Sequence, residues 1–166
     1  MSEERLQQIV NEISEHRADL VRAAIPTQFV HVGPGEEIEG AYDRILIDAP
    51  CTGLGALRRR PEARWRKSLE DLKELVKIQK SLLDSGAEHL RGGGVIGYVT
   101  CSPHVAETRL QVADFLHRHK EFSLLNVAPY VPQEFQDQIL PNGTLQLWPH
   151  KNQSDAMFLA LLKKSL

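Results

Sequence analysis

The chain has 166 residues, of which 42% are hydrophobic and 25% charged, so it can bury a real core and is not mainly disordered. Its 20 basic and 22 acidic residues nearly cancel, so any contact with nucleic acid must come from a local basic patch. No apolar run approaches the ~20 residues of a membrane span, the N-terminus lacks signal-peptide character, and two cysteines make no disulfide framework, which together predict a cytoplasmic protein with no membrane contact.

The amino-terminal segment gives an ambiguous pattern. Residues 15–24 suit a helix that Pro26 ends, and residues 8–13 suit a short strand. The apolar spacing also allows one continuous helix over residues 2–24. If the strand forms, Glu12 closes it, where an acidic side chain can bind the ribose hydroxyls of a nucleotide. A solvated glutamate on a helix is the alternative.

Two near-continuous apolar segments, residues 42–48 and 95–100, predict strands that are buried on both faces of a parallel sheet. Between them lies a long amphipathic stripe that is typical of a helix. Ser68 can cap the start of this helix, and the glycines at 92–94 can end it.

The rest of the chain predicts one more helix and three strands. Pro103 suits the first position of a helix that runs to about residue 119, with Ser102 as its cap. The strand candidates are residues 123–127, 144–148 and 157–162. Strands that alternate with helices predict an α/β fold with a mainly parallel sheet, and the closely spaced strands of the tail predict an antiparallel hairpin at its edge.

Each of the two buried strands is followed by a cysteine. If the strands are neighbours, their ends lie about 5 Å apart, so Cys51, Cys101 and the Asp48 carboxylate converge on one crevice. Cys101 precedes a predicted helix N-terminus, which favours a nucleophilic thiolate; inert buried cysteines are the alternative. A carboxylate at the end of an apolar strand is costly unless it is used, although Asp48 could instead cap the turn at Thr52 and Gly53.

A basic segment leads into the long helix. Residues 58–67 contain six basic residues, one acidic residue and a tryptophan. Such a segment can bind a phosphate backbone and stack a base, and it leaves the same sheet edge as the cysteines; a solvated loop is the alternative. The candidate RNA-binding residues are Arg58, Arg59, Arg60, Arg64 and Trp65. The seven histidines show no spacing typical of a metal site, so no metal is expected.

Several segments match one known signature. Residues 42–53 end in Asp-Ala-Pro-Cys-Thr-Gly, and residues 100–102 read Thr-Cys-Ser with Glu107 downstream. In this order they resemble the Sun/Fmu (RsmB-like) family of S-adenosylmethionine-dependent RNA cytosine-C5 methyltransferases. Supporting likenesses are found at Arg58–Glu62 with Trp65, at Ile9–Ser14 with Arg17, and at Trp148–His150 with Asp155–Phe158.

The resemblance implies a Rossmann-like methyltransferase sheet and a cysteine mechanism. By this likeness Cys101 attacks carbon 6 of cytosine, Asp48 hydrogen-bonds the ring nitrogen, and Cys51 helps to release the covalent adduct. The implied cofactor is S-adenosylmethionine, held in part by Glu12, Asp48 and Pro50. The implied partner is RNA, either rRNA or tRNA, and the oligomeric state stays open.

The chain departs from the family pattern in three places. It has no Pro-Gly-Gly-Lys-Thr-type loop for the cofactor, Pro34 stands in the turn that helps to hold the adenosine, and Ala156 replaces a glycine. We therefore expect residues 1–166 to be a single, partial catalytic domain, truncated at its amino end, that binds the cofactor weakly or not at all. The alternative is a non-catalytic RNA- or protein-binding module that keeps the fold. A thiol hydrolase is the weaker alternative, because His104 has no evident orienting partner.

Overall fold

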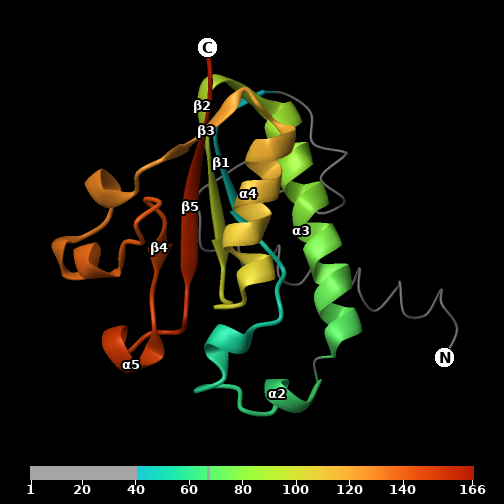
Figure 1. Ribbon diagram of the computed structural model, residues 1–166, viewed down its shortest axis with the longest axis vertical. Helices are drawn as coiled ribbons and strands as arrows, with labels where there is room; N and C mark the ends of the chain where they lie inside the picture. Colours follow the sequence, from blue (N-terminus) through green and yellow to red (C-terminus); the bar gives the residue numbers. More distant parts are fainter. Residues whose placement is uncertain (1–40, 67) are drawn as a thin grey trace, which may run out of the picture. The chain divides into compact units, whose positions relative to one another are not determined.

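The computed structural model describes residues 41–66 and 68–166 (Figure 1). The strands are β1 (Tyr42–Asp48), β2 (Leu90–Thr100), β3 (Phe122–Leu125), β4 (Leu145–Gln146) and β5 (Phe158–Lys164). The α-helices are α2 (Ala63–Arg66), α3 (Leu69–His89), α4 (Arg109–Arg118) and α5 (Pro149–Asn152). The 3-10 helices are η2 (Leu54–Ala56), η3 (Val105–Glu107), η4 (Ala128–Tyr130) and η5 (Gln133–Gln138). The predictions for residues 2–24, Glu12 included, lie outside this description.

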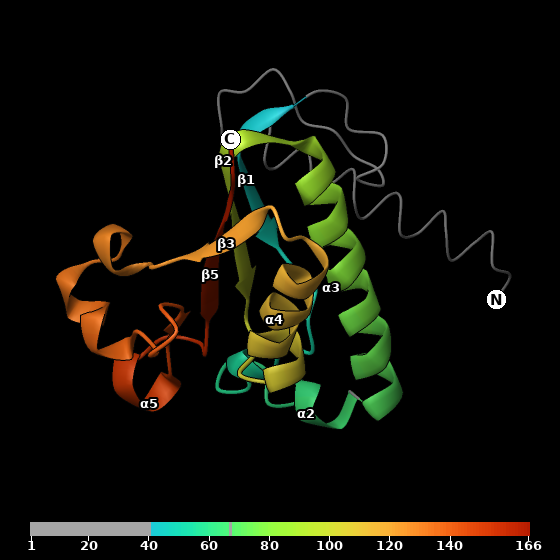
Figure 2. The ribbon, with the colours of Figure 1, turned by 45° about the horizontal axis from the view of Figure 1, so that its top comes forward.

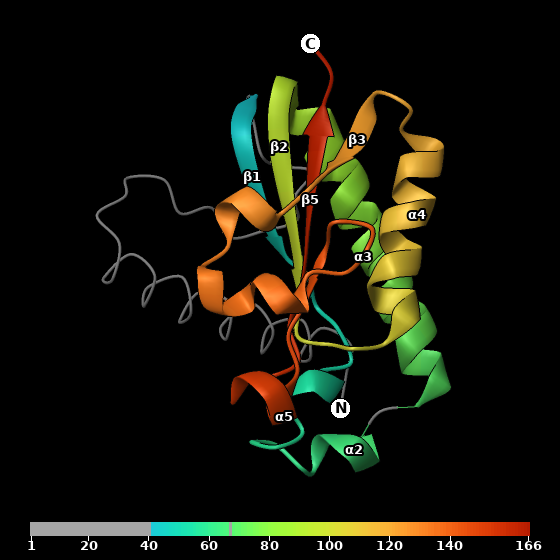
Figure 3. The same cartoon turned by 60° about the vertical axis from the view of Figure 1, so that its left-hand side comes forward.

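The sheet has the order β1-β2-β5-β3, with β4 also paired to β5. Within the described ranges, β1 and β2 are the only parallel pair, and β5 is antiparallel to each of its three partners. The α/β class is confirmed, and the two tail strands β4 and β5 do pair antiparallel, as expected. The expectation of a mainly parallel sheet is wrong here, and so is the expected place of this pair at the sheet edge. Strands β2 and β3, joined by α4, do run in the same direction, yet β5 inserts between them and pairs with both (Figure 3).

Helix α3 begins where the sequence predicts and ends before the glycines. Ser68 Oγ accepts from the Asp71 N–H at 3.2 Å, and the Asp71 carboxylate accepts from the Ser68 N–H at 2.8 Å, which makes a capping box. The helix ends at His89, and Gly92 to Gly94 already belong to β2. Local side-chain chemistry therefore places the start of this helix better than its end.

One face of the sheet packs against α3 and α4, which lie together (Figure 2). The core between these layers is built from large apolar side chains, among them Leu83, Ile96, Tyr98, Phe115 and Phe158. On β1, Ile45 and Ile47 face this core, whereas Leu46 points to the opposite face and is 73% exposed. The expectation that β1 is buried on both faces is therefore wrong for the described part of the chain.

The predicted helix start at Pro103, with Ser102 as its cap, is also wrong. Residues 101–104 form a loop, η3 follows, and α4 begins only at Arg109. The hydroxyl of Ser102 donates instead to the Glu107 carboxylate, with 2.6 Å between Oγ and Oε2. Its oxygen still accepts from the His104 N–H at 3.1 Å, but α4 begins only at Arg109, so this contact does not cap that helix.

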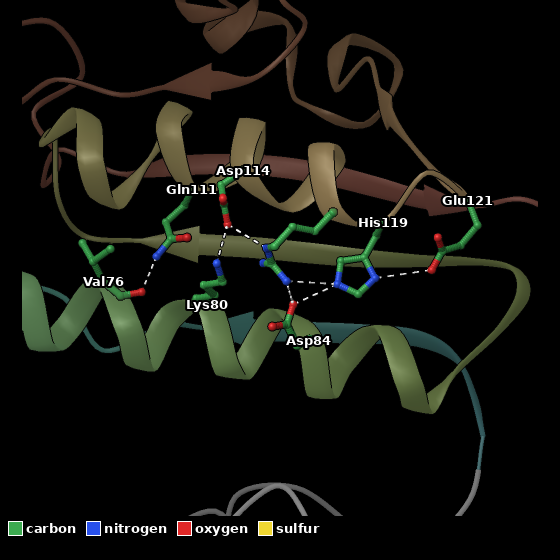
Figure 4. Close-up of polar contacts among 8 residues, drawn as sticks. Val76, Lys80, Asp84, Gln111, Asp114, His119 and Glu121 are labelled. Carbon is green, nitrogen blue, oxygen red and sulfur yellow. Dashed lines mark hydrogen bonds and ion pairs between the residues drawn. The ribbon is translucent and has the colours of Figure 1, made fainter.

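A group of charged side chains joins α3 to α4 (Figure 4). Asp84 accepts a hydrogen bond from Arg118, and His119 Nε2 lies 2.9 Å from Asp84 Oδ1. Arg118 Nε also donates to Asp114 Oδ2 at 2.8 Å, and Lys80 Nζ lies 3.3 Å from the same oxygen. We call these five residues the helix-pair cluster. Its members are partly exposed, so water and salt screen their charges.

No helix in the described ranges is long and apolar enough to cross a membrane.

Candidate active site

The two cysteines meet beyond the carboxyl ends of β1 and β2. Strand β1 ends opposite Val99 of β2, so the first cysteine loop (residues 49–53) and the second cysteine loop (residues 101–104) leave the sheet side by side, near α2 and α5 (Figure 3). Cys51 Sγ lies 3.3 Å from Cys101 Sγ, and both thiols are free and half-buried. The predicted convergence of the two thiols is confirmed by this contact.

The contact shifts the pKa values of the two thiols in opposite directions. The hydrogen bond with Cys51 lowers the pKa of Cys101 to about 7, although burial and the charges of Asp48 and Asp155 act in the opposite direction. The same hydrogen bond, and then burial, raises the pKa of Cys51. The contact therefore favours a state in which the two sulfurs share one proton and the negative charge lies on Cys101. The predicted cause, a helix N-terminus, is wrong, because α4 begins only at Arg109 and a helix dipole acts within its first turn.

The fully buried side chain of Glu107 binds both cysteine loops. From the first loop, Thr52 donates its N–H to Oε1 at 2.7 Å and its hydroxyl to Oε2 at 2.5 Å. From the second loop, Ser102 donates its hydroxyl to Oε2 at 2.6 Å. From α3, Gln79 donates its amide to Oε1 at 3.2 Å and also to the Pro50 carbonyl at 2.9 Å. We call Glu107, Thr52, Ser102 and Gln79 the Glu107 network.

Neutral donors satisfy this buried carboxylate. Each oxygen accepts two hydrogen bonds, which offsets the cost of removing a carboxylate from water. Burial, and then the Glu107 charge, raises the pKa of Tyr98, whose hydroxyl donates to the Glu107 carbonyl at 2.8 Å. Sequence reasoning gave Glu107 no role of its own. The available signal was a hydroxyl residue directly after each cysteine, Thr52 and Ser102.

Asp48 and Pro50 lie exposed at the same edge of the sheet. The Thr52 N–H donates to Glu107, so the suggestion that Asp48 caps this amide is wrong. Asp48 makes no hydrogen bond to any other described residue, and its charge acts on Cys101. The carboxylate is therefore near the thiols and open to a ligand.

Gly55 ties a third segment to the cysteine loops. Its N–H donates to the Cys101 carbonyl at 3.0 Å, and its carbonyl accepts from the Ala156 N–H at 3.0 Å. A Cβ at this position would lie 2.2 Å from the Ala156 oxygen, so only glycine fits without displacing the backbone. Residues 155–156 are thereby held beside the second cysteine loop.

The structure divides the five predicted RNA-binding residues into two groups. Arg59 binds the Asp155 carboxylate, with Nε 2.9 Å from Oδ1, and lowers the pKa of that carboxyl; Arg58 donates to the Gln153 carbonyl at 3.0 Å. The other three, Arg60, Arg64 and Trp65, are exposed, and the Arg64 guanidinium lies 4.8 Å from the centre of the Trp65 ring. All five side chains are exposed, and two of the arginines also hold the loop in place.

Residues 1–163 match the family model of the 16S rRNA methyltransferase RsmB/F. A candidate methyltransferase of Mycobacterium tuberculosis strain H37Rv is 46% identical over 160 residues, which are 92% of this chain and 34% of that protein. The ribosomal RNA small subunit methyltransferase B of Pectobacterium carotovorum is 38% identical over 124 residues, 75% of this chain and 27% of that protein.

Two solved structures share the fold. PH0851 superposes with a TM-score of 0.65 at 36% identity and covers 74% of this chain and 26% of its own. NSun6 from Pyrococcus horikoshii superposes with a TM-score of 0.70 at 24% identity and covers 99% and 40%. The chain spans about a third of the length of the curated relatives quoted above. Its family match over nearly all residues confirms the resemblance of the motifs, and the chain belongs to the RsmB/F family of 16S rRNA methyltransferases.

Proposed function

We propose that this chain carries the cysteine chemistry of an RNA cytosine-5 methyltransferase that acts on rRNA or tRNA. One observation carries the proposal: the thiols of Cys51 and Cys101 touch at 3.3 Å beyond the ends of two parallel strands. Such a pair supplies one thiolate and one thiol at neutral pH, and a thiolate is a good nucleophile. Membership of a family of S-adenosylmethionine-dependent RNA methyltransferases supports the same reaction.

In the proposed mechanism the Cys101 thiolate attacks carbon 6 of cytosine and forms a sulfur–carbon bond. The electron pair of the carbon 5–carbon 6 double bond moves into the ring, which makes carbon 5 a nucleophile. Negative charge develops on ring nitrogen 3, which takes up a proton from solvent, and the Asp48 carboxylate stabilises this state by accepting a hydrogen bond from the new N–H. This proton returns to solvent when the double bond re-forms. After carbon 5 has gained its methyl group, a base removes the remaining hydrogen of carbon 5. The double bond then re-forms and the sulfur leaves with its electron pair.

Cys51 is proposed to assist this last step. Its raised pKa keeps it protonated near neutral pH, and its sulfur lies within hydrogen-bond reach of the Cys101 sulfur. A hydrogen bond from Cys51 stabilises the departing thiolate, which makes Cys101 a better leaving group. Loss of Cys51 should therefore slow release of the adduct more than its formation.

The family uses S-adenosylmethionine, which supplies the methyl group when it is bound. Asp48 fits such a ligand, because its exposed carboxylate can accept hydrogen bonds from an ammonium group or from hydroxyls. Pro50 is exposed beside it, while its carbonyl is used by Gln79. We propose that Asp48 and Pro50 border the cofactor, together with Glu12.

The decisive test replaces one cysteine at a time. This chain would be placed in the M. tuberculosis relative in exchange for the matching third, which is 46% identical. Cys101→Ala should abolish methyl transfer and leave no covalent RNA adduct. Cys51→Ala should trap labelled RNA on the protein, visible on a denaturing gel. The opposite pattern would reverse the two roles, and no adduct in either variant or in the unaltered chimera would contradict the proposal.

We further propose that Arg60, Arg64 and Trp65 contact the RNA, by phosphate binding and base stacking. Replacing Arg60 and Trp65 with Ala should weaken RNA binding and make the slope of log affinity against log salt less steep, by roughly 0.7 for a lost single-strand phosphate contact. Lys77→Ala is the control, because Lys77 is equally exposed but lies on α3, paired with Glu74. An unchanged slope in the double variant would contradict this assignment.

For the chain by itself, a non-catalytic RNA- or protein-binding role is the second candidate. The observation in its favour is the missing Gly-rich cofactor loop in residues 1–166. We expect calorimetry with the pure chain to show weak binding of S-adenosylmethionine or none. Micromolar affinity would show that other residues replace the loop, and would remove the reason for this alternative.

A further inference from the structure

We infer that Glu107 is a positioning residue that holds the Cys51 and Cys101 thiols in contact. The catalytic meaning of this inference rests on the proposed function, whereas its geometry does not. Glu107 itself touches neither sulfur in the proposed reaction. It binds the residue that directly follows each cysteine, Thr52 and Ser102.

A single carboxylate oxygen fixes the distance between the two loops. Glu107 Oε2 accepts the Thr52 hydroxyl at 2.5 Å and the Ser102 hydroxyl at 2.6 Å, and these two hydroxyl oxygens lie 3.3 Å apart. The sulfur–sulfur distance of the adjacent cysteines is also 3.3 Å. Because each hydroxyl is one residue from its thiol, a change in their separation must move the thiols as well.

Thr52 Oγ1 and Ser102 Oγ also lie within hydrogen-bond distance of each other, but both hydroxyls already donate to Glu107. The backbone contacts between these segments lie elsewhere. The Ala49 N–H donates to the Val99 carbonyl at 2.9 Å, which aligns the strand ends. The Gly55 N–H donates to the Cys101 carbonyl, which joins η2 to the second loop. In the described ranges, Glu107 alone bonds to the side chains of both Thr52 and Ser102. It therefore sets the approach of the loops at the point where the thiols lie.

The chemistry of the donors predicts which substitutions the site tolerates. Oε1 accepts two N–H donors, from Thr52 and Gln79, which cannot reverse their roles. Oε2 accepts two hydroxyls, which can turn and accept instead. Glu107→Gln can therefore keep its oxygen on the first side and its NH₂ on the second, and should preserve the loops. Glu107→Ala removes the acceptor of all four hydrogen bonds, although Gln79 keeps the Pro50 carbonyl, and should let the loops separate.

Separation of the loops has a measurable consequence. Contact with Cys51 is the largest cause that lowers the pKa of Cys101 to about 7. Without that contact the Cys101 pKa should return toward ~8.5, the value of an ordinary cysteine. At pH 7 the thiolate fraction, and with it the rate of alkylation by iodoacetamide, should fall about tenfold.

The experiment uses the reduced 166-residue chain without RNA or cofactor. Two readouts are the pH profile of iodoacetamide alkylation and the binding of phenylarsine oxide, whose arsenic needs two adjacent thiols. The unaltered chain should show a midpoint near pH 7 and bind the arsenical at one per chain. Glu107→Ala should raise the midpoint and bind the arsenical more than tenfold less tightly, while Glu107→Gln should resemble the unaltered chain.

Thr144→Val is the matched control, because it removes a buried hydroxyl that bonds Asn142 at 2.7 Å, outside the cysteine loops. It should lower thermal stability and leave both thiol readouts unchanged. If Glu107→Ala does not fold, Ser102→Ala decides the question, since it detaches only the second loop. Normal thiol readouts in the folded Glu107→Ala chain, or failing that in Ser102→Ala, would overturn the inference.

The proposed function can fail separately. If the thiols depend on Glu107 but the unaltered chimera transfers no methyl group and its Cys51→Ala variant traps no RNA, the function is wrong and the positioning role stands. If the unaltered chimera methylates RNA and both thiol readouts are normal in Glu107→Ala, the positioning role is wrong and the function stands.

Discussion

The Glu107 network and the helix-pair cluster both link segments that are distant in sequence, but in opposite surroundings. Glu107 is fully buried and accepts hydrogen bonds from neutral donors. Asp84 and Asp114 are 35% and 45% exposed and pair with the Arg118 cation. Water can replace a lost partner at the exposed cluster but cannot reach the buried one. The comparison teaches that burial of the acceptor, more than charge pairing, decides which carboxylate the fold depends on.

The largest effect is expected at Glu107. Glu107→Ala should lower the free energy of unfolding by about 3 kcal/mol, because it strands several buried donors. Urea denaturation would measure it, with Thr144→Val as a variant that loses one buried hydrogen bond and should lose about 1 kcal/mol. Equal losses of unfolding free energy in the two variants would mean that the Glu107 network stabilises the fold no more than a single buried hydrogen bond does.

Gly55 offers the next largest effect at the same end of the sheet. Gly55→Ala should cost about 2 kcal/mol, since the new methyl group collides with the Ala156 oxygen. Gly53→Ala is the control, because Gly53 has open space around it and a φ of +70°. That strain alone should cost about 1 kcal/mol. Thermal unfolding of both variants would show whether packing or backbone conformation limits this segment.

The helix-pair cluster should give a smaller effect. Asp84→Asn removes the charge that faces Arg118 and His119 and should cost about 0.5–1 kcal/mol in low salt. The loss should shrink at high ionic strength, because salt screens partly exposed charges. Glu74→Gln, on a more exposed pair with Lys77 beyond the first turn of α3, should change stability by almost nothing. If Asp84→Asn lowers the free energy of unfolding as much as Glu107→Ala does, burial of the carboxylate does not decide its contribution to stability.

The smallest expected effect is the contribution of Asp114 to the dependence of stability on acidic pH. A hydrogen bond from Arg118 lowers the pKa of Asp114. The stability from this shift is therefore present above the unfolded-state pKa of about 3.9 and is lost as pH falls through the lower, folded-state pKa. Asp114→Asn should remove a few tenths of a kcal/mol of this acid dependence, given its exposure to water. Unfolding temperatures between pH 2 and 6 would test it, and parallel curves for the two proteins would contradict it.

Local chemistry made part of the fold and site predictable. The apolar run of β1 has the predicted limits, Tyr42–Asp48, and the Ser68 cap of α3 forms because both partners lie within one turn. The thiol contact followed from one assumption, that two strands with cysteines at their ends are parallel neighbours. That assumption holds, so a pair 50 residues apart in sequence could be placed together.

The sheet order and the partners of Ser102 and Arg59 could not be predicted, because each depends on contacts that the local sequence pattern does not reveal. The pattern predicts that β2 and β3 run in the same direction, but it does not reveal that β5 lies between them. The Ser102 hydroxyl donates to Glu107, whose burial the sequence pattern does not reveal. Arg59 pairs with Asp155, which is 96 residues away in the sequence. In each case the fold, and not the local sequence, brings the observed partner into contact.

The central place of β5 has a consequence for synthesis on the ribosome. Strand β5 is the last described strand to emerge, yet β2 and β3 both pair with it and do not pair with each other. Until residues 158–164 leave the exit tunnel, both earlier strands expose an unpaired edge. The nascent chain must therefore keep these edges apart from other chains until residues 158–164 are available, and a premature stop before Phe158 leaves β2 and β3 without the strand that joins them.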